Sequence, residues 1–394
     1  MNVVFLTSKL NFKTAGGSVM DLHLKAKGIA DLEHTVTVIT AFSHANILVE
    51  PLPYTHIEEM VTSRGLIGIQ YGALRVLQKY AARADVIYID GQIFLYGGGM
   101  YRLFGGTVPV VAFFNTRPNA WADIHGSSTR PSVLKRIKIV LRKFIEHRIG
   151  VPIVRNIDAY IFNTPMVEKL YLDWGLRKEK SSIVEDFVDM RGIVEQNHIT
   201  KEKIKANQRN QPLITFFSTG RMLKEKGFEL IVRAFATFND KNRYRVVITG
   251  DGPDKKRIET LTKNLGLSDF ISFPGWVDKE TLSRYFLNSH IFIFPKWCIE
   301  YGSALLTEAL AFGLPCIIPA GGALEWLTEG NVATFKHEDF EDLAAKMKRL
   351  AEDEKWRVSL AQKGLARVET LDYRVLCKHL EHVLETTFQK NQPR

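Results

Sequence analysis

Cysteine is scarce in this chain, and no hydrophobic run is long enough to cross a membrane. The 394 residues include three cysteines, Cys298, Cys316 and Cys377, whose spacing fits neither a disulfide framework nor a zinc site. No apolar stretch reaches the roughly 18 residues of a spanning helix. The opening residues 1–11 are typical of a first strand and not of a signal peptide. We therefore expect a cytoplasmic protein, or one bound to the cytoplasmic face of a membrane.

The composition is that of a soluble globular α/β protein. Hydrophobic residues make up 45% of the chain and charged residues 24%. A chain of 394 residues exceeds the size of a single hydrophobic core, which favours two domains. The polar stretch 190–212 precedes a strongly apolar segment and is the expected linker. The expected domains are residues 1–195 and 196–372.

The most informative segment runs from residue 290 to residue 320. Its pattern predicts a strand at 290–295, a loop, a helix at about 303–312 with Ser303 as N-cap, and a second strand. Glu300 precedes the helix, whose free N–H groups and dipole favour an anion, and Glu308 follows on a later turn. Such a site suits a ligand with a diphosphate and hydroxyl groups. An ordinary strand-helix-strand unit with two surface glutamates is the alternative.

Two further turns in this half of the chain suit the same ligand. The strand beginning at residue 213 ends in a turn that carries Arg221 and, five residues later, Lys226. Both cations can reach one diphosphate, Arg as a bidentate fork and Lys as a point charge. The next strand ends in the turn Gly-Asp-Gly-Pro from Gly250. Repeated strand ends with glycine turns and helix starts predict a doubly wound sheet with a ligand crevice.

The N-terminal half predicts a second domain of the same kind. Gly16 and Gly17 follow the first strand and open a helix, so their N–H groups could contact the ligand diphosphate. The glycine-rich segment 91–106 is interpreted as a packed helix, because it lacks the Lys or Ser/Thr of a phosphate loop. The expected strands are 3–8, 35–40, 85–90, 108–114 and 158–165.

These motifs together resemble the family 4 retaining glycosyltransferases, which have the GT-B fold and use nucleotide sugars. The resemblance rests on the Gly-Gly loop, the GR…KG turn at 220–227, the GDGP turn, and the E-x7-E pair followed by EALAFGLP and the Gly-Gly-x-x-E of 321–325. It covers nearly the whole chain and is tightest over about residues 213–330. The resemblance implies an α/β fold of two Rossmann-like, doubly wound parallel-sheet domains that face a central cleft. It also implies that a C-terminal helix, 373–388, returns to the first domain.

The resemblance implies a retaining, metal-independent hexosyltransferase. It would move a sugar from a nucleotide-sugar donor to a glycan or lipid-linked acceptor in the synthesis of cell-surface polysaccharide or glycoconjugate. No cofactor or metal is expected, and the chain has no Asp-x-Asp tripeptide of the kind that clamps a metal-diphosphate in the other transferase fold. A sugar-nucleotide epimerase of the same fold and a non-catalytic nucleotide-sugar-binding protein are the alternatives.

Residue roles follow from the same resemblance. Arg221, Lys226 and the helix N-terminus after Gly302 would neutralise the leaving diphosphate, Glu308 would bind the ribose hydroxyls, and Glu300 the hydroxyls of the donor sugar. The expected catalytic residues are Glu300, Arg221 and Lys226. The expected donor-binding residues are Gly16, Gly17, Arg221, Lys226, Gly250, Glu300, Tyr301, Gly302, Ser303, Ala304 and Glu308.

One feature of the family is missing on the acceptor side. The strand that often ends in a His near the reacting sugar ends here in Asn115, which can bond a hydroxyl but cannot transfer a proton at neutral pH. Arg117 lies just beyond it. His125 could reach the same space from the next loop, or it could be a surface residue. The acceptor-side candidates are therefore Asn115, Arg117 and His125.

The net charge of +10 is concentrated in one segment, 130–148, which holds seven Lys or Arg residues against one Glu. As a helix over 133–148 it would place five cations opposite an apolar face. Such a helix can lie on an anionic membrane surface, or it can pack in a core with its basic face in water. No nucleic-acid-binding motif occurs, so nucleic acid is not an expected partner. The donor base, the sugar and the acceptor are not specified by these patterns.

Overall fold

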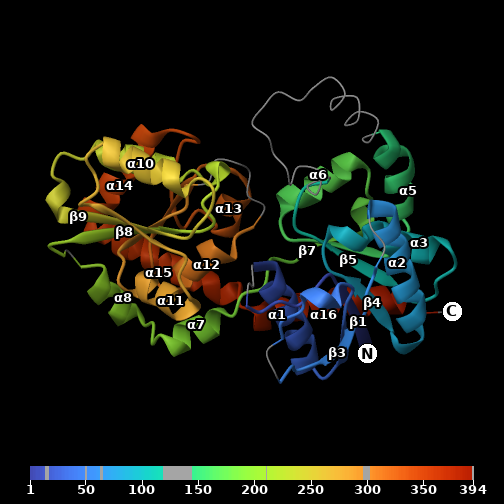
Figure 1. Ribbon diagram of the computed structural model, residues 1–394. Coiled ribbons are helices and arrows are strands. Elements are labelled where there is room, and N and C mark those ends of the chain that lie inside the picture. Colours follow the sequence, from blue (N-terminus) through green and yellow to red (C-terminus); the bar gives the residue numbers. More distant parts are fainter. Residues whose placement is uncertain are drawn as a thin grey trace. The chain divides into compact units, whose positions relative to one another are not determined.

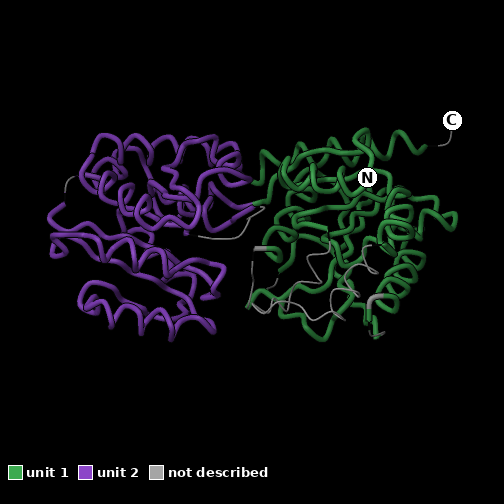
Figure 2. Tube along the Cα trace, turned by 90° about the horizontal axis from the view of Figure 1, so that it is seen from above, with its two compact units in different colours: residues 1–187, 373–394 green, residues 188–372 purple. Residues whose placement is uncertain are grey.

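The computed structural model describes residues 1–13, 17–48, 51–62, 65–118, 144–209, 211–295 and 302–392. The chain divides into two compact units, coloured separately in Figure 2: unit 1 holds residues 1–187 and 373–394, and unit 2 holds residues 188–372. Several expected site residues lie outside the described residues, namely Gly16, His125, Glu300, Tyr301 and the first eleven residues of the segment 133–148.

Unit 1 is built on a seven-stranded parallel sheet in the order β3-β2-β1-β4-β5-β6-β7 (Figure 1). The strand order reverses between β1 and β4, as in a Rossmann fold. Both short edge strands, β3 and β7, occur where no strand is expected from the sequence. The strands are β1 Asn2–Thr7, β2 Thr35–Thr40, β3 Thr55–Glu58, β4 Val86–Ile89, β5 Val110–Phe114, β6 Ala159–Phe162 and β7 Ser181–Ile183.

The last helix of the chain packs in unit 1. Its residues Tyr373, Leu376, Leu380 and Leu384 are buried in the same core as the first strand. The Lys27 ammonium donates to the Tyr373 hydroxyl at 3.0 Å, which ties this helix to α1. The helices of the unit are α1 Gly17–Asp31, α2 Gly65–Tyr80, α3 Leu95–Leu103, α5 Val151–Val154 with a π-helical turn Glu146–Gly150 before it, α6 Pro165–Trp174 and α16 Tyr373–Lys390.

The glycine-rich segment 91–106 forms a packed helix, which confirms the prediction. A 3-10 turn, Gln92–Phe94, leads into α3, and Gly97, Gly98 and Gly99 are buried. A Cβ atom at Gly99 would lie 2.3 Å from the carbonyl oxygen of Ile153, which immediately precedes the last residue of α5. The glycines are therefore needed for close helix packing.

Unit 2 is a six-stranded parallel sheet in the order β10-β9-β8-β11-β12-β13. Its strand order reverses between β8 and β11. Two parallel-sheet units confirm the predicted α/β architecture of two Rossmann-like domains. The strands are β8 Ile214–Thr219, β9 Tyr244–Thr249, β10 Ile271–Gly275, β11 Ile291–Ile293, β12 Cys316–Pro319 and β13 Ala333–Phe335. The helices are α7 Met190–Gln196, α8 Lys201–Asn207, α9 Phe228–Ala236, α10 Lys255–Asn264, α11 Lys279–Leu287, α12 Ala304–Ala311, α13 Gly322–Leu327, α14 Phe340–Glu352 and α15 Glu354–Thr370.

The sheet of unit 2 is covered on both faces. Along β8, Phe216 belongs to one hydrophobic cluster and Phe217 to the other. Because both faces are buried, the strands are nearly continuous apolar runs, and the sequence pattern predicts them well. The segment 190–212, whose polar composition favours a linker, forms α7 and α8 in the structure. Their apolar residues Met190 and Ile204 are buried in the same hydrophobic cluster of unit 2 as Phe217.

Two glycine loops of unit 2 meet backbone to backbone at the carboxyl ends of β8 and β9. The N–H of Gly220 donates to Thr249, and that of Met222 donates to Asp251. Gly250 has a φ of 117°, and a Cβ atom there would lie 2.0 Å from the carbonyl oxygen of Gly220. Only glycine fits at this crossing.

We expect Gly250→Ala to destabilise unit 2 by more than about 2 kcal/mol, because the methyl group must displace backbone and not a flexible side chain. Gly266→Ala is the matched control, since Gly266 also has a positive φ, 67°, but has open space around its Cβ position. The control should cost only about 1 kcal/mol. Urea unfolding followed by circular dichroism measures both, and equal losses would contradict the packing argument.

Candidate functional site

The N-terminus of α12 lies at the carboxyl edge of the unit 2 sheet. The Ser303 hydroxyl accepts a hydrogen bond from the Leu306 N–H at 3.2 Å, so Ser303 is the predicted N-cap. Among the described residues, no group accepts from the N–H groups of Ala304 and Leu305. With Gly302 just before the cap, this helix start exposes donors and a positive dipole end to an anion.

Glu308 lies one turn farther along α12 and is half-buried. Burial raises the pKa of its carboxyl group to about 7, and the charge of Lys279 on α11 only partly offsets this effect. No described residue donates a hydrogen bond to the carboxylate. Glu308 is thus a poorly solvated acceptor whose lone pairs can serve hydroxyl groups of a ligand.

The two predicted cations lie in the loop between β8 and α9. Arg221 is exposed and lies two residues beyond the end of β8. Lys226 ends a 3-10 turn, and its ammonium lies 5.9 Å from the centre of the Phe294 ring. Phe294 follows β11, so Lys226 lies at the point where the strand order reverses between β8 and β11. The structure therefore brings Arg221 and Lys226 to the edge that also holds the α12 N-terminus.

The loops around these cations are braced by side chains. Arg257 on α10 donates to Asp254 through Nε at 2.6 Å, and it also pairs with Glu229 on α9. In the Gly-Gly-x-x-E segment, Gly321 N donates to the Glu325 carboxylate at 2.6 Å. This Glu caps the start of α13, a structural role that the sequence motif by itself does not reveal.

In unit 1, the structure describes Gly17, Asn115 and Arg117 from the predicted set. Gly17 begins α1, Asn115 follows β5 and is half-buried, and Arg117 is exposed. The strand register places Asn115 on the same sheet face as Phe113 and level with Asn163, because Phe113 pairs with Ile161. Asn115 therefore lies on the face that α1 covers, at the carboxyl edge of the sheet.

That edge holds a charged cluster that the sequence analysis missed. Asp21 and Lys25 come from α1, Asp90 follows β4, and Asp186 follows β7. Lys25 is fully buried and pairs with Asp21 at 2.5 Å. Burial raises the pKa of Asp90 and of Asp186 to about 7 each, and the neighbouring Asp21 acts in the same direction. We refer to these four residues as the unit 1 acidic cluster.

The signal for this cluster is present in the sequence but weak. Asp90 ends the otherwise apolar run VIYID, and Asp21 and Lys25 are one turn apart on the helix after the first strand. Asp186 follows the seventh strand, a short strand without an apolar run. Only the register of the sheet brings these positions together.

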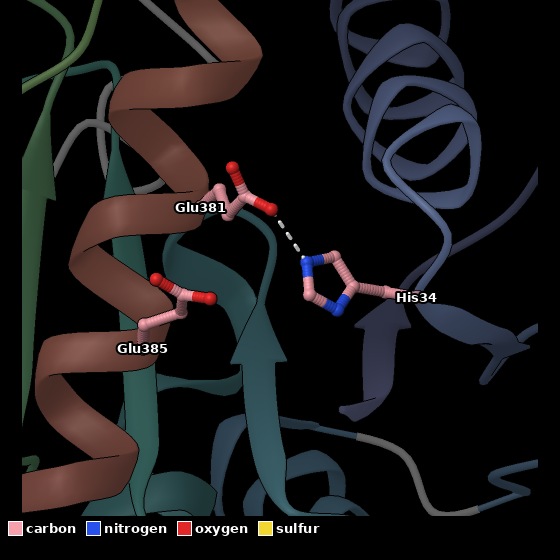
Figure 3. Close-up of side chains that lie close together, drawn as sticks. All are labelled: His34, Glu381 and Glu385. Atoms are coloured by element: carbon pink, nitrogen blue, oxygen red, sulfur yellow. Dashed lines mark hydrogen bonds and ion pairs between the residues drawn. The ribbon is translucent and has the colours of Figure 1, made fainter.

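His34, Glu381 and Glu385 form another group of charged side chains (Figure 3). Their ligand atoms lie within 4.8 Å of one another, and His34 Nε2 is 2.7 Å from a carboxylate oxygen of Glu381. His34 precedes β2, so the group lies at the amino edge of the sheet, opposite the acidic cluster. Its visible role is to hold α16 against the α1–β2 turn.

In the part of the chain that the structure describes, no helix is both long and apolar enough to span a membrane. Cys316 and Cys377 are buried, and Cys298 lies outside the described residues.

Comparisons with known families match both halves of the chain. The model described as "Glycosyltransferase Family 4" matches residues 15–191, and the model described as "Glycosyl transferases group 1" matches residues 199–367. Each match covers one of the two Rossmann-like units.

Among curated proteins, the chain is similar to mannosylfructose-phosphate synthase of Agrobacterium fabrum, with 23% identity over 56% of this chain and 50% of that protein. It is also similar to the lipopolysaccharide core biosynthesis glycosyltransferase LpsE of Rhizobium meliloti, with 25% identity over 53% of this chain and 58% of that protein. The chain thus spans about half the length of the curated relatives it matches.

Two solved structures share the fold over nearly the whole chain. Anabaena Alr3699/HepE in complex with UDP and glucose matches with a TM-score of 0.73 at 16% identity, over 98% of this chain and 100% of that one. Sucrose-phosphate synthase of Thermosynechococcus elongatus matches with a TM-score of 0.75 at 16% identity, over 99% of each chain.

The raised pKa of Glu308 predicts a pH-dependent effect of Glu308→Gln on stability. The folded protein holds this proton more tightly than the unfolded chain, so the contribution of Glu308 to stability is full below pH 4.5 and is lost as the pH rises through about 7. Glutamine avoids the buried charge. We expect the variant to raise the thermal midpoint by at least about 2 °C at pH 8 and to leave it unchanged at pH 4.5.

The matched control is Glu280→Gln on α11, whose carboxylate is exposed. It should shift the midpoint little at either pH. A shift for Glu308→Gln that is the same at both pH values would contradict the assigned burial of its charge.

Proposed function

Because the chain belongs to the family 4 glycosyltransferases, we propose that it transfers a sugar from a nucleotide-sugar donor to a glycan or lipid-linked acceptor. The observation that carries the proposal is that two cations, a helix N-terminus and a carboxylate lie together at the carboxyl edge of the unit 2 sheet. Arg221 and Lys226 follow β8, the α12 N-terminus follows β11, and Glu308 lies one turn into α12. Cations, helix N–H groups and a hydroxyl-binding carboxylate together match a nucleoside diphosphate.

In this proposal unit 2 stabilises the leaving group. When the bond between the sugar C1 and the phosphate oxygen breaks, negative charge grows on the diphosphate. Arg221, Lys226 and the α12 N-terminus lie at one edge of the sheet, where they would stabilise that charge in the transition state. Glu308 binds the ribose hydroxyls. Glu300, which precedes the helix in sequence, binds hydroxyls of the donor sugar.

We further propose that transfer retains the anomeric configuration and needs no metal. The acceptor oxygen attacks C1 on the face from which the diphosphate departs, and its proton passes to a phosphate oxygen of the leaving group. One C1–O bond forms to the acceptor as the C1–O bond to the diphosphate breaks, and no oxidation or reduction is involved. Two protein cations supply the charge that a metal-diphosphate clamp supplies in enzymes with an Asp-x-Asp motif.

The relatives support a role in cell-surface polymers. LpsE is named for lipopolysaccharide core biosynthesis, and another relative, AmsK of Erwinia amylovora, for amylovoran biosynthesis. HepE was solved with UDP and glucose, which supports a nucleotide sugar as the donor class. We propose that this chain acts in the synthesis of polysaccharide or glycoconjugate.

We also propose that unit 1 contacts an anionic membrane surface through the segment 133–148. The described end of that segment supports the proposal, because Phe144 and Ile145 are 59% and 46% exposed, as is Ile149 (56%) just beyond it, beside the exposed Arg148. Exposed apolar side chains next to cations suit the interface of an anionic bilayer. A lipid-linked acceptor would be reached in this way.

Replacement of Lys226 by Ala should lower turnover by about 100-fold or more, the scale for loss of one charge-stabilising donor. Lys224→Ala is the control, because Lys224 lies in the same exposed 3-10 turn and has no assigned role. Both variants should fold normally. Turnover is measured as consumption of the nucleotide sugar that native electrospray screening shows to bind the intact chain.

The products separate the possible activities. Slow hydrolysis of the donor without acceptor is expected of a transferase. An epimerised sugar nucleotide would instead identify an epimerase, and binding without consumption would identify a binding protein. Wild-type turnover in Lys226→Ala would refute its assignment to the leaving group.

For the membrane, we expect wild type to co-sediment with anionic vesicles at low salt and to be released at high salt. The triple variant Lys135→Ser, Lys138→Ser and Arg142→Ser should stay in the supernatant, since each basic residue near such a surface contributes roughly 1 kcal/mol.

The control replaces three exposed lysines of α8 by Ser, namely Lys201, Lys203 and Lys205. It removes the same charge from unit 2 and should still co-sediment. If wild type remains in the supernatant at low salt, segment 133–148 does not bind membrane, and a soluble acceptor is indicated.

A further inference from the structure

The carboxyl edge of the unit 1 sheet carries polar groups on a single face, beneath α1. Phe5 pairs with Tyr88 in the parallel ladder, so Thr7 and Asp90 lie level at the ends of β1 and β4. Asn163 follows β6 and bonds to Asp186, which lies beyond β7. The strand order reverses between β1 and β4, and ligands of such sheets bind at that position.

One half of the acidic cluster is internally satisfied. The Asp21 carboxylate accepts from the Lys25 ammonium at 2.5 Å and from the Phe187 N–H at 2.7 Å. The Lys25 ammonium also lies 3.1 Å from the centre of the Phe113 ring. This buried pair fixes α1 to the sheet and forms the base of the site.

The other half is incompletely satisfied. Asp90 accepts one hydrogen bond, from the Thr7 hydroxyl at 3.3 Å, and Asp186 accepts one, from the Asn163 amide at 3.1 Å. Both bonds use Oδ2, and no described residue donates to Oδ1 of either carboxylate. Both side chains are half-buried, so a ligand can reach them. Each carboxylate can therefore accept further hydrogen bonds from a ligand.

A second observation points to a ligand. The hydroxyl of Tyr88 has no hydrogen-bond partner in the described part of the chain, although the side chain is 0% exposed. Tyr88 lies two residues before Asp90 and therefore on the same face of the sheet, and the charges of Asp90, Asp21 and Asp186 add to burial in raising the pKa of its hydroxyl. A buried polar group of this kind is normally satisfied by water or by a bound molecule.

The spacing and the sign of charge limit what the ligand is. Among the described residues, only His34, Glu381 and Glu385 lie close enough together to form a group of three metal ligands. The carboxylates of the acidic cluster are farther apart, so the cluster does not suit a metal ion. Lys25 neutralises Asp21, and the partly ionised Asp90 and Asp186 leave the cluster with a net negative charge. This charge repels phosphate and carboxylate groups and attracts hydrogen-bond donors.

We propose that the unit 1 acidic cluster is an acceptor subsite for an uncharged or cationic polyol, whose hydroxyl or ammonium groups donate to Asp90 and Asp186, and that it rejects anionic acceptors. The proposal rests on the proposed transferase function for the identity of the ligand as the acceptor. The two units then bind different kinds of group: unit 2 binds the anionic diphosphate, and unit 1 binds an uncharged or cationic hydrogen-bond donor.

Saturation-transfer NMR on the full chain tests this with four probes of similar size: methyl glucoside, glucosamine, glucuronate and glucose 6-phosphate. Inorganic pyrophosphate is present throughout to fill the cationic site of unit 2. Wild type should bind the glucoside and glucosamine at least about tenfold more tightly than either anion, as like-charge juxtaposition predicts.

Asp90→Asn and Asp186→Asn keep the shape and remove the charge. Each should bind methyl glucoside about tenfold more weakly, because a neutral amide oxygen is a weaker acceptor than a carboxylate, and should lose most of the discrimination against glucuronate. Asp173→Asn, an exposed change on α6, is the control and should keep it. A purely structural role for the two carboxylates would alter affinity for all probes alike.

Three results would overturn the proposal: equal binding of neutral and anionic probes by wild type, binding of none of the four, or discrimination that survives in both Asn variants. Donor hydrolysis that depends on Lys226 is measured on the same preparations. If it persists while the discrimination is absent, the acceptor subsite is wrong and the transferase function stands.

Discussion

Both sheets are wholly parallel and covered on both faces. Because the faces are covered, a ligand can be bound only at the edges of the sheets. The buried faces are mostly apolar, and Phe216 and Phe217, adjacent on β8, both serve as core. At the carboxyl edge the strands stop and the loops turn back into helices. There the backbone N–H groups, the glycine turns and the charged side chains can face a ligand. Lys226 and Glu308 in unit 2 and Asp90 and Asp186 in unit 1 all lie at such edges.

The features that depend on local sequence were predictable. β2 has the predicted bounds, 35–40, because six alternating β-branched residues leave no competing structure. The capped helix after residue 303 was also predictable, since a cap involves neighbouring residues only. The edge strands β3 and β7 were missed because they are short and only half-buried, so they carry no apolar signal. Asp90 and Asp186 share one edge of the unit 1 sheet only because strands far apart in sequence are neighbours in the sheet, which no local pattern encodes.

The two edges use opposite charges for a physical reason. A diphosphate brings its own negative charge, so unit 2 supplies cations and helix N–H groups that need not be buried to act. A sugar hydroxyl brings no charge, so the group that binds it must be a strong hydrogen-bond acceptor. The lone pairs of that acceptor must also be shielded from water. Half-buried carboxylates meet this need, because burial removes competing water while a neighbouring donor fixes the orientation of one oxygen.

Burial of these carboxylates costs stability in the unliganded protein. Glu308, Asp90 and Asp186 all have pKa values raised to about 7 by desolvation, so at neutral pH each is ionised only in part. A ligand hydroxyl or ammonium that donates to the carboxylate lowers that desolvation cost and favours the ionised form. Substrate binding and ionisation are then linked, and each stabilises the other. In the proposed complexes, the desolvation cost of these carboxylates is offset when the ligand binds.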